Sequence, residues 1–346
     1  MSLATKHESP GARPASTVRD DFGDVRGEFL ALTSGCGVYD LSGRAKISVA
    51  GSDRVRWLNG MVTNNIRDLA PGHGVYAFLL NPQGHILGDL YAYNRGESLL
   101  ADTGRSQTEK ILSVFDKYII MDDVEVADVS DKLAALGVGG PKARESLLAA
   151  GFELPELAPL QFVDLSWEQV SLTVVRSDSP YGKSFELWLA PENVERVYDA
   201  VVRAQAKPVG ATAIELFRIA AGVPRYGIDI RERDLPQETE QERALNFSKG
   251  CYVGQEIVER IRSRGQVRRK FSGFEIHGPL PPGTKLLAEG KEVGEITSAA
   301  SLPLASGDRS VALGYIRREV ATPGRVIDAG GSEARVANLP FFATSS

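Results

Sequence analysis

One short stretch of the chain combines residue types that could do chemistry with residues that could present them. It reads Lys-Gly-Cys-Tyr-Val-Gly-Gln-Glu and covers residues 249–256. Apolar residues recur at helical spacing from residue 254 onward, so Cys251 is expected just ahead of a helix N-terminus. Unpaired backbone N–H groups, the helix dipole and the nearby Lys249 all favour a thiolate there. Cys251 is therefore a candidate reactive group.

Two glycines, Gly250 and Gly254, flank the cysteine. Glycine lets the backbone turn tightly and approach a ligand as a residue with a side chain could not. The alternative interpretation is structural, with Cys251 as a small apolar residue buried in a turn before a helix. The local sequence leaves both interpretations open.

Composition narrows the class of protein. The chain has 346 residues, 42% hydrophobic and 25% charged, with a net charge of −5. These values fit a soluble protein of two or three domains and argue against a bulk nucleic-acid binder, and no apolar run is long enough to span a membrane. The two cysteines, Cys36 and Cys251, are far apart, which argues against a disulfide framework or a preassembled metal site and favours a reducing cytoplasm. Residues 1–17 lack an apolar signal core and are expected to form a disordered tail.

The elements that must position residues 249–256 are predicted from hydrophobic periodicity and turn chemistry. The first unit contains helices across residues 22–32, 52–62 and 111–119, a strand at 46–49, a hairpin around the turn Asn81-Pro-Gln-Gly84, and a strand at 98–102. A second unit repeats this order in residues 124–217, with strands at 124–129, 133–137, 170–176 and 185–189 and helices at 141–151 and 192–204. Two such units predict α+β subdomains whose helices cover one face of antiparallel sheets.

The pattern changes after residue 265. Short alternating runs broken by Pro-Gly and Gly-Gly pairs predict a small all-β barrel or sandwich at residues 270–342. The predicted organisation is α+β: a tail at 1–17, two α+β subdomains in 18–265 and a β-barrel in 266–346.

The motif of residues 249–256 carries a resemblance that periodicity does not supply. Together with Leu245-Asn-Phe-Ser before it and Arg264-Gly265 after it, the stretch resembles the K-G-C-[F/Y]-x-G-Q-E signature of YgfZ-type folate-binding proteins, which assist iron–sulfur cluster assembly and repair. The wider superfamily of the glycine cleavage T-protein (aminomethyltransferase) is similar over most of the chain. The residues that carry this wider similarity are the 81–84 turn, the block from Gly210 to Gly227 and the run from Val293 to Ile316.

The resemblance implies a cloverleaf of two ferredoxin-like subdomains and a C-terminal barrel around a tetrahydrofolate pocket. In that pocket Asp89 is expected to serve the folate nitrogen chemistry, and Glu186 to pair with N–H groups of the pterin. Tyr226 is expected to stack on an aromatic ring of the folate. For Asp89 and Glu186 an ordinary strand position is the open alternative, and for Tyr226 simple packing. The other implied folate-binding residues are Asn81, Arg218, Gly250, Gly254, Gln255 and Glu256.

Several positions depart from the T-protein pattern. T-proteins carry two adjacent acids where this chain has Gly88-Asp89, and they lack the cysteine of the signature. Ala220 replaces a further acid, and of the T-protein acids around residue 183 only Glu186 is retained. These departures argue against aminomethyl transfer and leave folate binding in place.

Six basic residues crowd the segment 260–270. Three interpretations are open for this segment: a solvated helix face, a docking site for the glutamate tail of folate, and a contact for RNA or an acidic partner protein. No aromatic residues are interleaved with these basic residues, which disfavours nucleic acid.

The main hypothesis is a tetrahydrofolate-binding accessory protein for iron–sulfur clusters that uses Cys251, with iron–sulfur proteins or assembly factors as partners. The alternatives are a folate-dependent aminomethyltransferase that relies on Asp89, and a non-catalytic folate-sensing scaffold.

Overall fold

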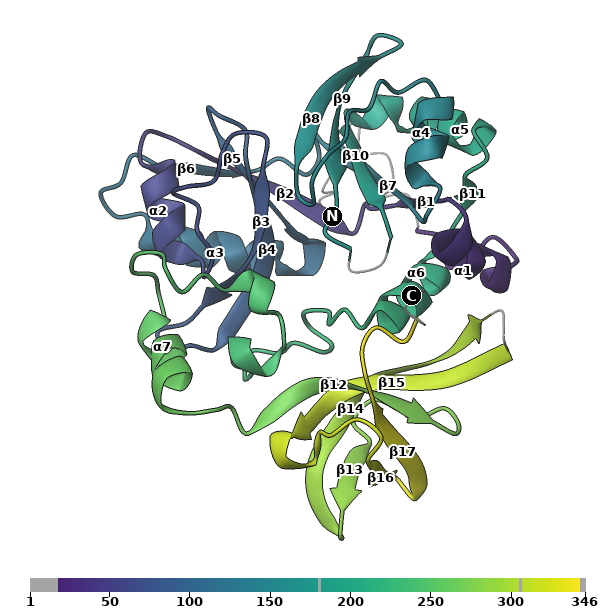
Figure 1. Cartoon of the computed structure of the whole chain (residues 1–346). Coiled ribbons are helices and arrows are strands. Elements are labelled where there is room, and N and C mark those ends of the chain that lie inside the picture. Colours follow the sequence, from purple (N-terminus) through teal and green to yellow (C-terminus); the bar gives the residue numbers. More distant parts are fainter. Residues whose placement is uncertain (1–17, 180–181, 305–306, 343–346) are drawn as a thin grey trace, which may run out of the picture.

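The computed structural model describes residues 18–179, 182–304 and 307–342. Two sheets with helices and a closed barrel form the three leaves of a cloverleaf (Figure 1). The predicted α+β fold with a C-terminal β-barrel is confirmed.

The first sheet has five strands in the order β3-β4-β5-β2-β6, and one of its faces is covered by two helices. Alternate residues of each strand point to that face, so Ile47 and Val49 pack against Trp57 and Phe115 of the helices. The elements are β2 (Arg44–Ala50), α2 (Arg54–Met61), β3 (Gly74–Leu80), β4 (Ile86–Asn94), β5 (Leu99–Gly104), η1 (Arg105–Gln107), α3 (Thr108–Tyr118) and β6 (Glu125–Asp128).

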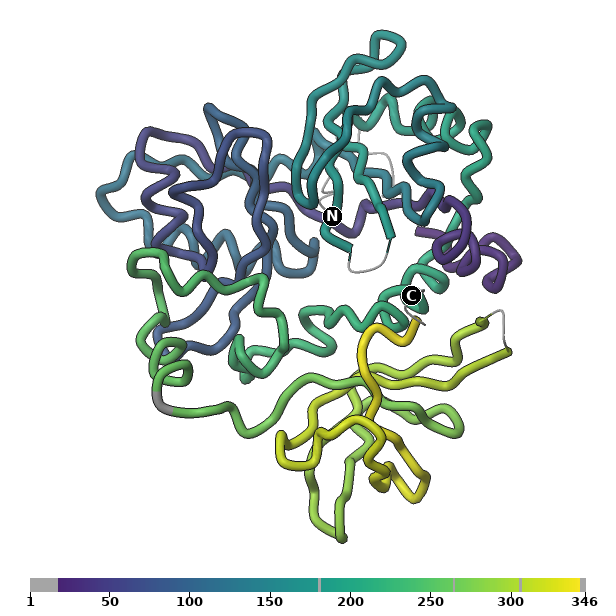
Figure 2. The backbone as a smooth tube through the Cα atoms, in the orientation of Figure 1, coloured from purple at the N-terminus to yellow at the C-terminus, as the bar shows by residue number. Residues whose placement is uncertain are grey.

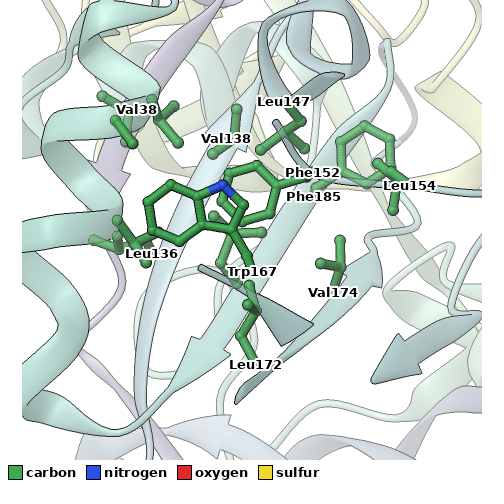
Figure 3. Packing of buried hydrophobic residues seen from close by; sticks show 14 of the residues in the cluster. Val38, Leu136, Val138, Leu147, Phe152, Leu154, Trp167, Leu172, Val174 and Phe185 are labelled. Carbon is green, nitrogen blue, oxygen red and sulfur yellow. The ribbon is translucent and has the colours of Figure 1, made fainter. Parts of the chain in front are cut away.

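The second sheet has six strands in the order β11-β1-β7-β10-β9-β8. Its core contains stacked Phe152 and Trp167 rings, 5.1 Å apart between centroids, among aliphatic side chains from the strands and helices (Figure 3). The elements are β1 (Gly37–Asp40), β7 (Ala134–Gly139), α4 (Ala143–Ala149), β8 (Phe162–Trp167), β9 (Val170–Arg176), β10 (Ser184–Leu189), η2 (Pro191–Asn193), α5 (Val194–Arg203) and β11 (Lys207–Pro208).

The faces of the two sheets that lack helices meet each other. Tyr93 of β4 and Trp188 of β10 pack edge to face with centroids 5.0 Å apart, in a cluster that also contains Leu100 and Val175. Polar residues two or four positions from these aromatic residues along the same strands share this face and are therefore held between the sheets.

The sheets do not follow the chain as two successive blocks. Strand β1 precedes the first sheet but pairs antiparallel with β7 of the second, and β6 pairs with β2 of the first. The prediction that residues 124–217 form one unit is wrong at β6, because strand pairing depends on tertiary contacts that periodicity does not contain. Strand β8 was not predicted. Phe22 was predicted to lie in the first helix, but that helix begins at Val25, because the side chain of Asp24 caps it by accepting the backbone N–H of Gly27 at 2.9 Å.

The barrel closes in the order β12-β15-β14-β13-β16-β17. Helices α1 (Val25–Ser34) and α6 (Ala211–Ala221) pack against it through a shared apolar cluster that includes Phe29 and Tyr315. Its elements are β12 (Arg269–Ile276), β13 (Lys285–Ala288), β14 (Lys291–Leu304), β15 (Gly307–Arg317), η5 (Arg318–Val320), β16 (Val326–Ala329) and β17 (Ser332–Ala337).

A long connection leads from α6 to the barrel. It crosses to the first sheet, carries η3 (Pro236–Glu238) and η4 (Glu242–Ala244), and enters α7 (Gln255–Arg264) before β12 (Figure 2). Residues 249–256 lie in this connection, and their last two residues begin α7.

Candidate functional site

The second glycine of the cysteine motif fits tightly against the β3–β4 hairpin. Gly254 is the N-cap of α7 and has φ of 82°, a left-handed conformation that favours glycine. A Cβ there would lie 2.6 Å from the backbone oxygen of Asn81 and 3.1 Å from the Cβ of Leu80. The close approach that requires glycine is thus to the hairpin of the same chain.

Asn81 organises that hairpin turn. Its side-chain oxygen accepts the backbone N–H groups of Gln83 at 3.0 Å and His85 at 2.9 Å. The structure thereby gives this predicted folate-binding residue an occupied local role. Its remaining contribution to a ligand site stays a prediction.

Lys249 points into the protein. Its side-chain amine donates to the backbone oxygens of Asn59 at 2.6 Å, Val62 at 2.6 Å and Asn64 at 2.7 Å. Burial, followed by the charge of Arg67, lowers the pKa of Lys249 to about 7. The three carbonyls oppose this lowering of the pKa, because they accept hydrogen bonds from all three N–H groups of the charged amine. Lys249 thus anchors the motif to the C-terminal end of α2.

Cys251 and Tyr252 have opposite environments. Cys251 is exposed and free, which excludes the interpretation of a buried apolar cysteine. Tyr252 is buried in an aromatic cluster with Tyr76, which Tyr226 borders. The cysteine therefore lies outside this cluster, next to exposed Gly250, and Gln255 and exposed Glu256 follow at the start of α7.

Asp89 lies on the face of the first sheet that has no covering helices, which we call its open face. Hydrogen bonds hold both of its carboxylate oxygens. Tyr76 donates its hydroxyl to Oδ2 at 2.7 Å, and Gln107 donates its amide to Oδ1 at 2.7 Å. The Asp89 backbone N–H in turn donates to the Gln107 side-chain oxygen at 3.0 Å. Two donors aimed at one carboxylate fix its orientation and match its ionised, acceptor form.

A continuous set of contacts leads across this open face. Tyr76 packs against Tyr91, with centroids 4.9 Å apart, and the Arg44 guanidinium lies 5.6 Å from the centre of the Tyr91 ring. Arg44 and Lys46 each place a nitrogen 3.0 Å from Oδ1 of buried Asp102. Oδ2 of Asp102 has no hydrogen-bond partner in the parts of the chain that the structure describes.

Glu186 completes this set from the second sheet. It accepts the Trp188 indole N–H at 2.8 Å, and the Lys46 amine lies 4.6 Å from the centre of the Trp188 ring. Burial and then the charge of Asp102 raise the pKa of Glu186, against the opposing effects of Lys46 and Arg44. Asp102 also experiences burial, but Arg44 and Lys46 outweigh it and lower the pKa of Asp102. Two carboxyls with opposite shifts therefore lie within one polar network.

We define the interdomain polar face as Arg44, Lys46, Tyr76, Asp89, Tyr91, Asp102 and Glu186. Sequence reasoning found only Asp89 and Glu186 of this set. The available signal was the alternation along strands: Asp89 and Tyr91 project to one face of β4, and Arg44 and Lys46 to one face of β2.

Tyr226 borders the interdomain polar face. Its hydroxyl donates to the Leu87 backbone oxygen at 2.6 Å, and the Lys110 amine donates to it at 3.0 Å. The structure therefore brings Tyr226 to strand β4, two residues from Asp89.

Arg218 lies elsewhere, in a network that joins α6 to the barrel. Its guanidinium pairs with Glu215 and Asp229, both at 2.7 Å, and donates to the Ser298 hydroxyl at 3.0 Å. These contacts give the guanidinium a structural role away from the polar face. The predicted contact between Arg218 and folate stays a prediction.

The basic segment 260–270 is in part structural. Arg262 lies over the Phe247 ring, Arg269 pairs with Asp234 and Glu238, and Lys270 pairs with Glu240.

Residues 18–179, 182–304 and 307–342 contain no group of three or more His, Cys, Asp and Glu side chains that could hold a metal ion. Among the helices that they form, none combines the length and apolarity needed to cross a lipid bilayer.

The comparison with protein families gives two matches. Residues 5–249 match the GCVT N-terminal domain, and residues 269–342 match the glycine cleavage T-protein C-terminal barrel domain.

Similar proteins cover nearly the whole chain. An aminomethyltransferase of Rubrobacter xylanophilus is 28% identical over 98% of this chain and 93% of the relative, and one of Thermus thermophilus is 30% identical over 91% and 89%. A putative chloroplastic transferase of Arabidopsis thaliana is 25% identical over 90% of this chain and 73% of its own length. The crystal structure of glycine cleavage system aminomethyltransferase T from Bartonella henselae has a TM-score of 0.82 at 22% identity, covering 92% of this chain and 89% of that one.

Proposed function

Because the chain belongs to the glycine cleavage T-protein family, through both its GCVT N-terminal domain and its C-terminal barrel domain, we propose that it is a folate-dependent one-carbon transferase of the aminomethyltransferase type. The relatives named aminomethyltransferase support this activity over the accessory function favoured by the cysteine motif. The observation that carries the proposal is the fixed acceptor geometry of Asp89 on the interdomain polar face.

The residues of that face fit a reduced folate. Glu186 offers a carboxylate to ring N–H groups, Tyr91 offers an aromatic surface, and Oδ2 of Asp102 is a buried acceptor that a polar ligand or water would satisfy. Tetrahydrofolate supplies the nitrogens that carry the one-carbon unit. Asp89 would accept a hydrogen bond or a proton from such a nitrogen, while Tyr76 and Gln107 hold its carboxylate in place.

One departure sets this chain apart within the family pattern. Gly88 stands where the T-protein pattern has a second acid, and a Cβ at Gly88 would lie 3.0 Å from the Gln107 side-chain oxygen. The space of a side chain at position 88 is therefore partly taken by the residue that orients Asp89. A single oriented carboxylate is the proposed working group. The two free cysteines keep a cytoplasmic location as our expectation.

Purified protein titrated with tetrahydrofolate, and then assayed with an aminomethyl-loaded carrier protein, tests this function. We expect saturable folate binding, followed by release of the amine and appearance of methylenetetrahydrofolate. Folate binding without turnover on any aminomethyl donor would reject the transferase activity, and a lack of folate binding would reject the whole proposal.

A second function rests on a separate observation, the exposed Cys251 thiol. It lies in a loop that Lys249 and Gly254 hold in place from both sides, and the motif resembles that of the iron–sulfur accessory proteins. An exposed, positioned thiol can react with a partner protein, whereas one thiol alone cannot hold a cluster.

The Cys251→Ser variant separates the two functions. Under the proposed transferase function, folate affinity and transfer rate stay within about twofold of wild type, because Cys251 lies outside the polar face. Complementation of a strain that lacks the protein, read out by the activity of an iron–sulfur enzyme, measures the second function. Loss of that activity with normal transfer would establish the accessory function, and full activity would exclude the thiol from it.

A further inference from the structure

Two charged residues that the proposed chemistry does not use contact the interdomain polar face. Arg243 belongs to η4, in the long connection between α6 and the barrel. Asp178 lies in the second sheet's part of the chain, two residues beyond the end of β9. The two side chains form an ion pair. This pair therefore joins the long connection to the second sheet.

Asp178 also contacts the first sheet. The hydroxyl of Tyr91, on β4, donates to Oδ1 of Asp178 at 3.2 Å, whereas Oδ2 is the oxygen paired with Arg243. Both carboxylate oxygens of Asp178 are thus occupied. The residue that follows β9 is thereby held on an aromatic side chain of the first sheet.

Arg243 lies over the ring of Tyr76. Its guanidinium carbon is 4.4 Å from the centre of that ring, a distance at which a cation is attracted to the aromatic face. The side-chain amide of Asn64 donates to the backbone oxygens of both Arg243 and Tyr76, each at 2.8 Å. Backbone and side-chain contacts therefore fix these two residues relative to each other.

Tyr76 is one of the two donors that orient Asp89, with its hydroxyl 2.7 Å from Oδ2. Burial and then the charge of Asp89 raise the pKa of Tyr76, and the charge of Arg243 opposes this rise. The hydroxyl therefore keeps its proton, and the nearby guanidinium makes it a stronger hydrogen-bond donor. Loss of the guanidinium would free one side of the ring and weaken the hydrogen bond to Asp89.

We propose that Arg243 and Asp178 are positioning residues for the one-carbon transfer, an inference that rests on the proposed folate-dependent function. The pair clamps the segment after β9 to Tyr76 and Tyr91, and so sets the direction from which Tyr76 donates to Asp89. Neither member of the pair takes up a proton in this role. The pair links the way the two sheets are held together to the orientation of the working carboxylate.

Steady-state kinetics of Arg243→Met and Asp178→Asn, with tetrahydrofolate and an aminomethyl-loaded carrier protein, test the proposal. We expect kcat to fall about tenfold in each variant, because a small misplacement of a catalytic group slows the reaction. Folate affinity, measured by calorimetric titration, should stay within about twofold of wild type, because Glu186 and its ring contacts are unchanged. The double variant should be no slower than the slower single variant, since the two side chains act as one pair.

Two further variants separate positioning from a general loss of structure. Arg243→Lys should keep kcat within about threefold of wild type, because lysine can retain both the ion pair and the cation over the ring. Arg196→Met is the matched control at the β8–β9 turn: Arg196 pairs with Glu168 at 2.9 Å and lies 5.5 Å from the centre of the Trp167 ring. We expect Arg196→Met to have the wild-type kcat.

If Arg243→Met and Asp178→Asn transfer as fast as Arg196→Met, or if lysine does not rescue the rate, the inference is overturned and the proposed function stands. Losses that multiply in the double variant would also contradict a single clamped pair. If the wild type transfers no one-carbon unit, the proposed function fails. Crystal structures of wild type and Arg243→Met then decide the positioning: a Tyr76 hydroxyl that leaves Asp89 supports it, and one that stays at hydrogen-bond distance overturns it.

Discussion

Changing Asp89 to asparagine is expected to lower the rate of one-carbon transfer about 100-fold or more, the range by which a positioned acid–base group contributes. Asparagine keeps the size of the side chain but cannot take up a proton at neutral pH. Its amide would also place a donor where Gln107 or Tyr76 now donates to a carboxylate oxygen. Both effects act at Asp89 itself, so the fold and most of the folate affinity should persist.

Steady-state kinetics with tetrahydrofolate in excess, together with a binding titration, measure this effect. The control is Asp164→Asn, the same substitution at an exposed acid that pairs with Arg95. We expect Asp164→Asn to transfer at the wild-type rate. A rate within a few-fold of wild type for Asp89→Asn would show that Asp89 has no part in the chemistry and would remove the main support for the transferase function.

Changing Lys249 to methionine is expected to lower the free energy of unfolding by about 3 kcal/mol, since each hydrogen bond contributes roughly 1 kcal/mol and three buried carbonyls lose their donor. Methionine fills a similar length but donates nothing. The carbonyls of Asn59, Val62 and Asn64 would then remain buried without the amine that satisfies them. The loop that carries Cys251 should loosen, because this lysine joins it to α2.

Urea denaturation followed by circular dichroism gives the free energy directly. Lys132→Met is the matched control, because Lys132 is exposed and its loss is expected to change stability by less than about 0.5 kcal/mol. If Lys249→Met were as stable as the control, the amine would not be an anchor.

The two variants test different parts of the protein. Asp89→Asn tests chemistry at the interdomain polar face, whereas Lys249→Met tests how the cysteine motif is held. If only Asp89→Asn loses transfer activity, at a temperature where both variants are folded, the reaction takes place at Asp89. The motif would then be a separate element of the surface.

Local patterns were sufficient for much of the secondary structure. The hairpin around Asn81 was predicted from turn residues between two alternating runs, and β3 and β4 lie on either side of it. The helix after Gly254 and the barrel strands after residue 265 follow in the same way from periodicity and from breaks at glycine and proline. These features depend on neighbours a few residues apart, which the sequence contains.

For residues 249–256, local patterns predicted the position of the cysteine but not the contacts of the lysine. The helical spacing after residue 254 correctly placed Cys251 before a helix N-terminus, and the exposure of Cys251 agrees with an available thiol. The lysine was assigned to the cysteine because it is two residues away. In the folded chain its amine instead meets the carbonyls of Asn59 and Val62, which lie 190 and 187 residues earlier.

The amino-acid sequence by itself determined the α+β class, the C-terminal barrel, the superfamily resemblance and the two acids Asp89 and Glu186 as candidates. Only the tertiary structure decided that these acids share one polar face with Arg44, Lys46 and Asp102, that Gly254 is needed for contact with a hairpin, and that Lys249 is an anchor. The physical reason is that strand alternation and helix periodicity specify which face a side chain takes, whereas its partners depend on how sheets distant in sequence pack together.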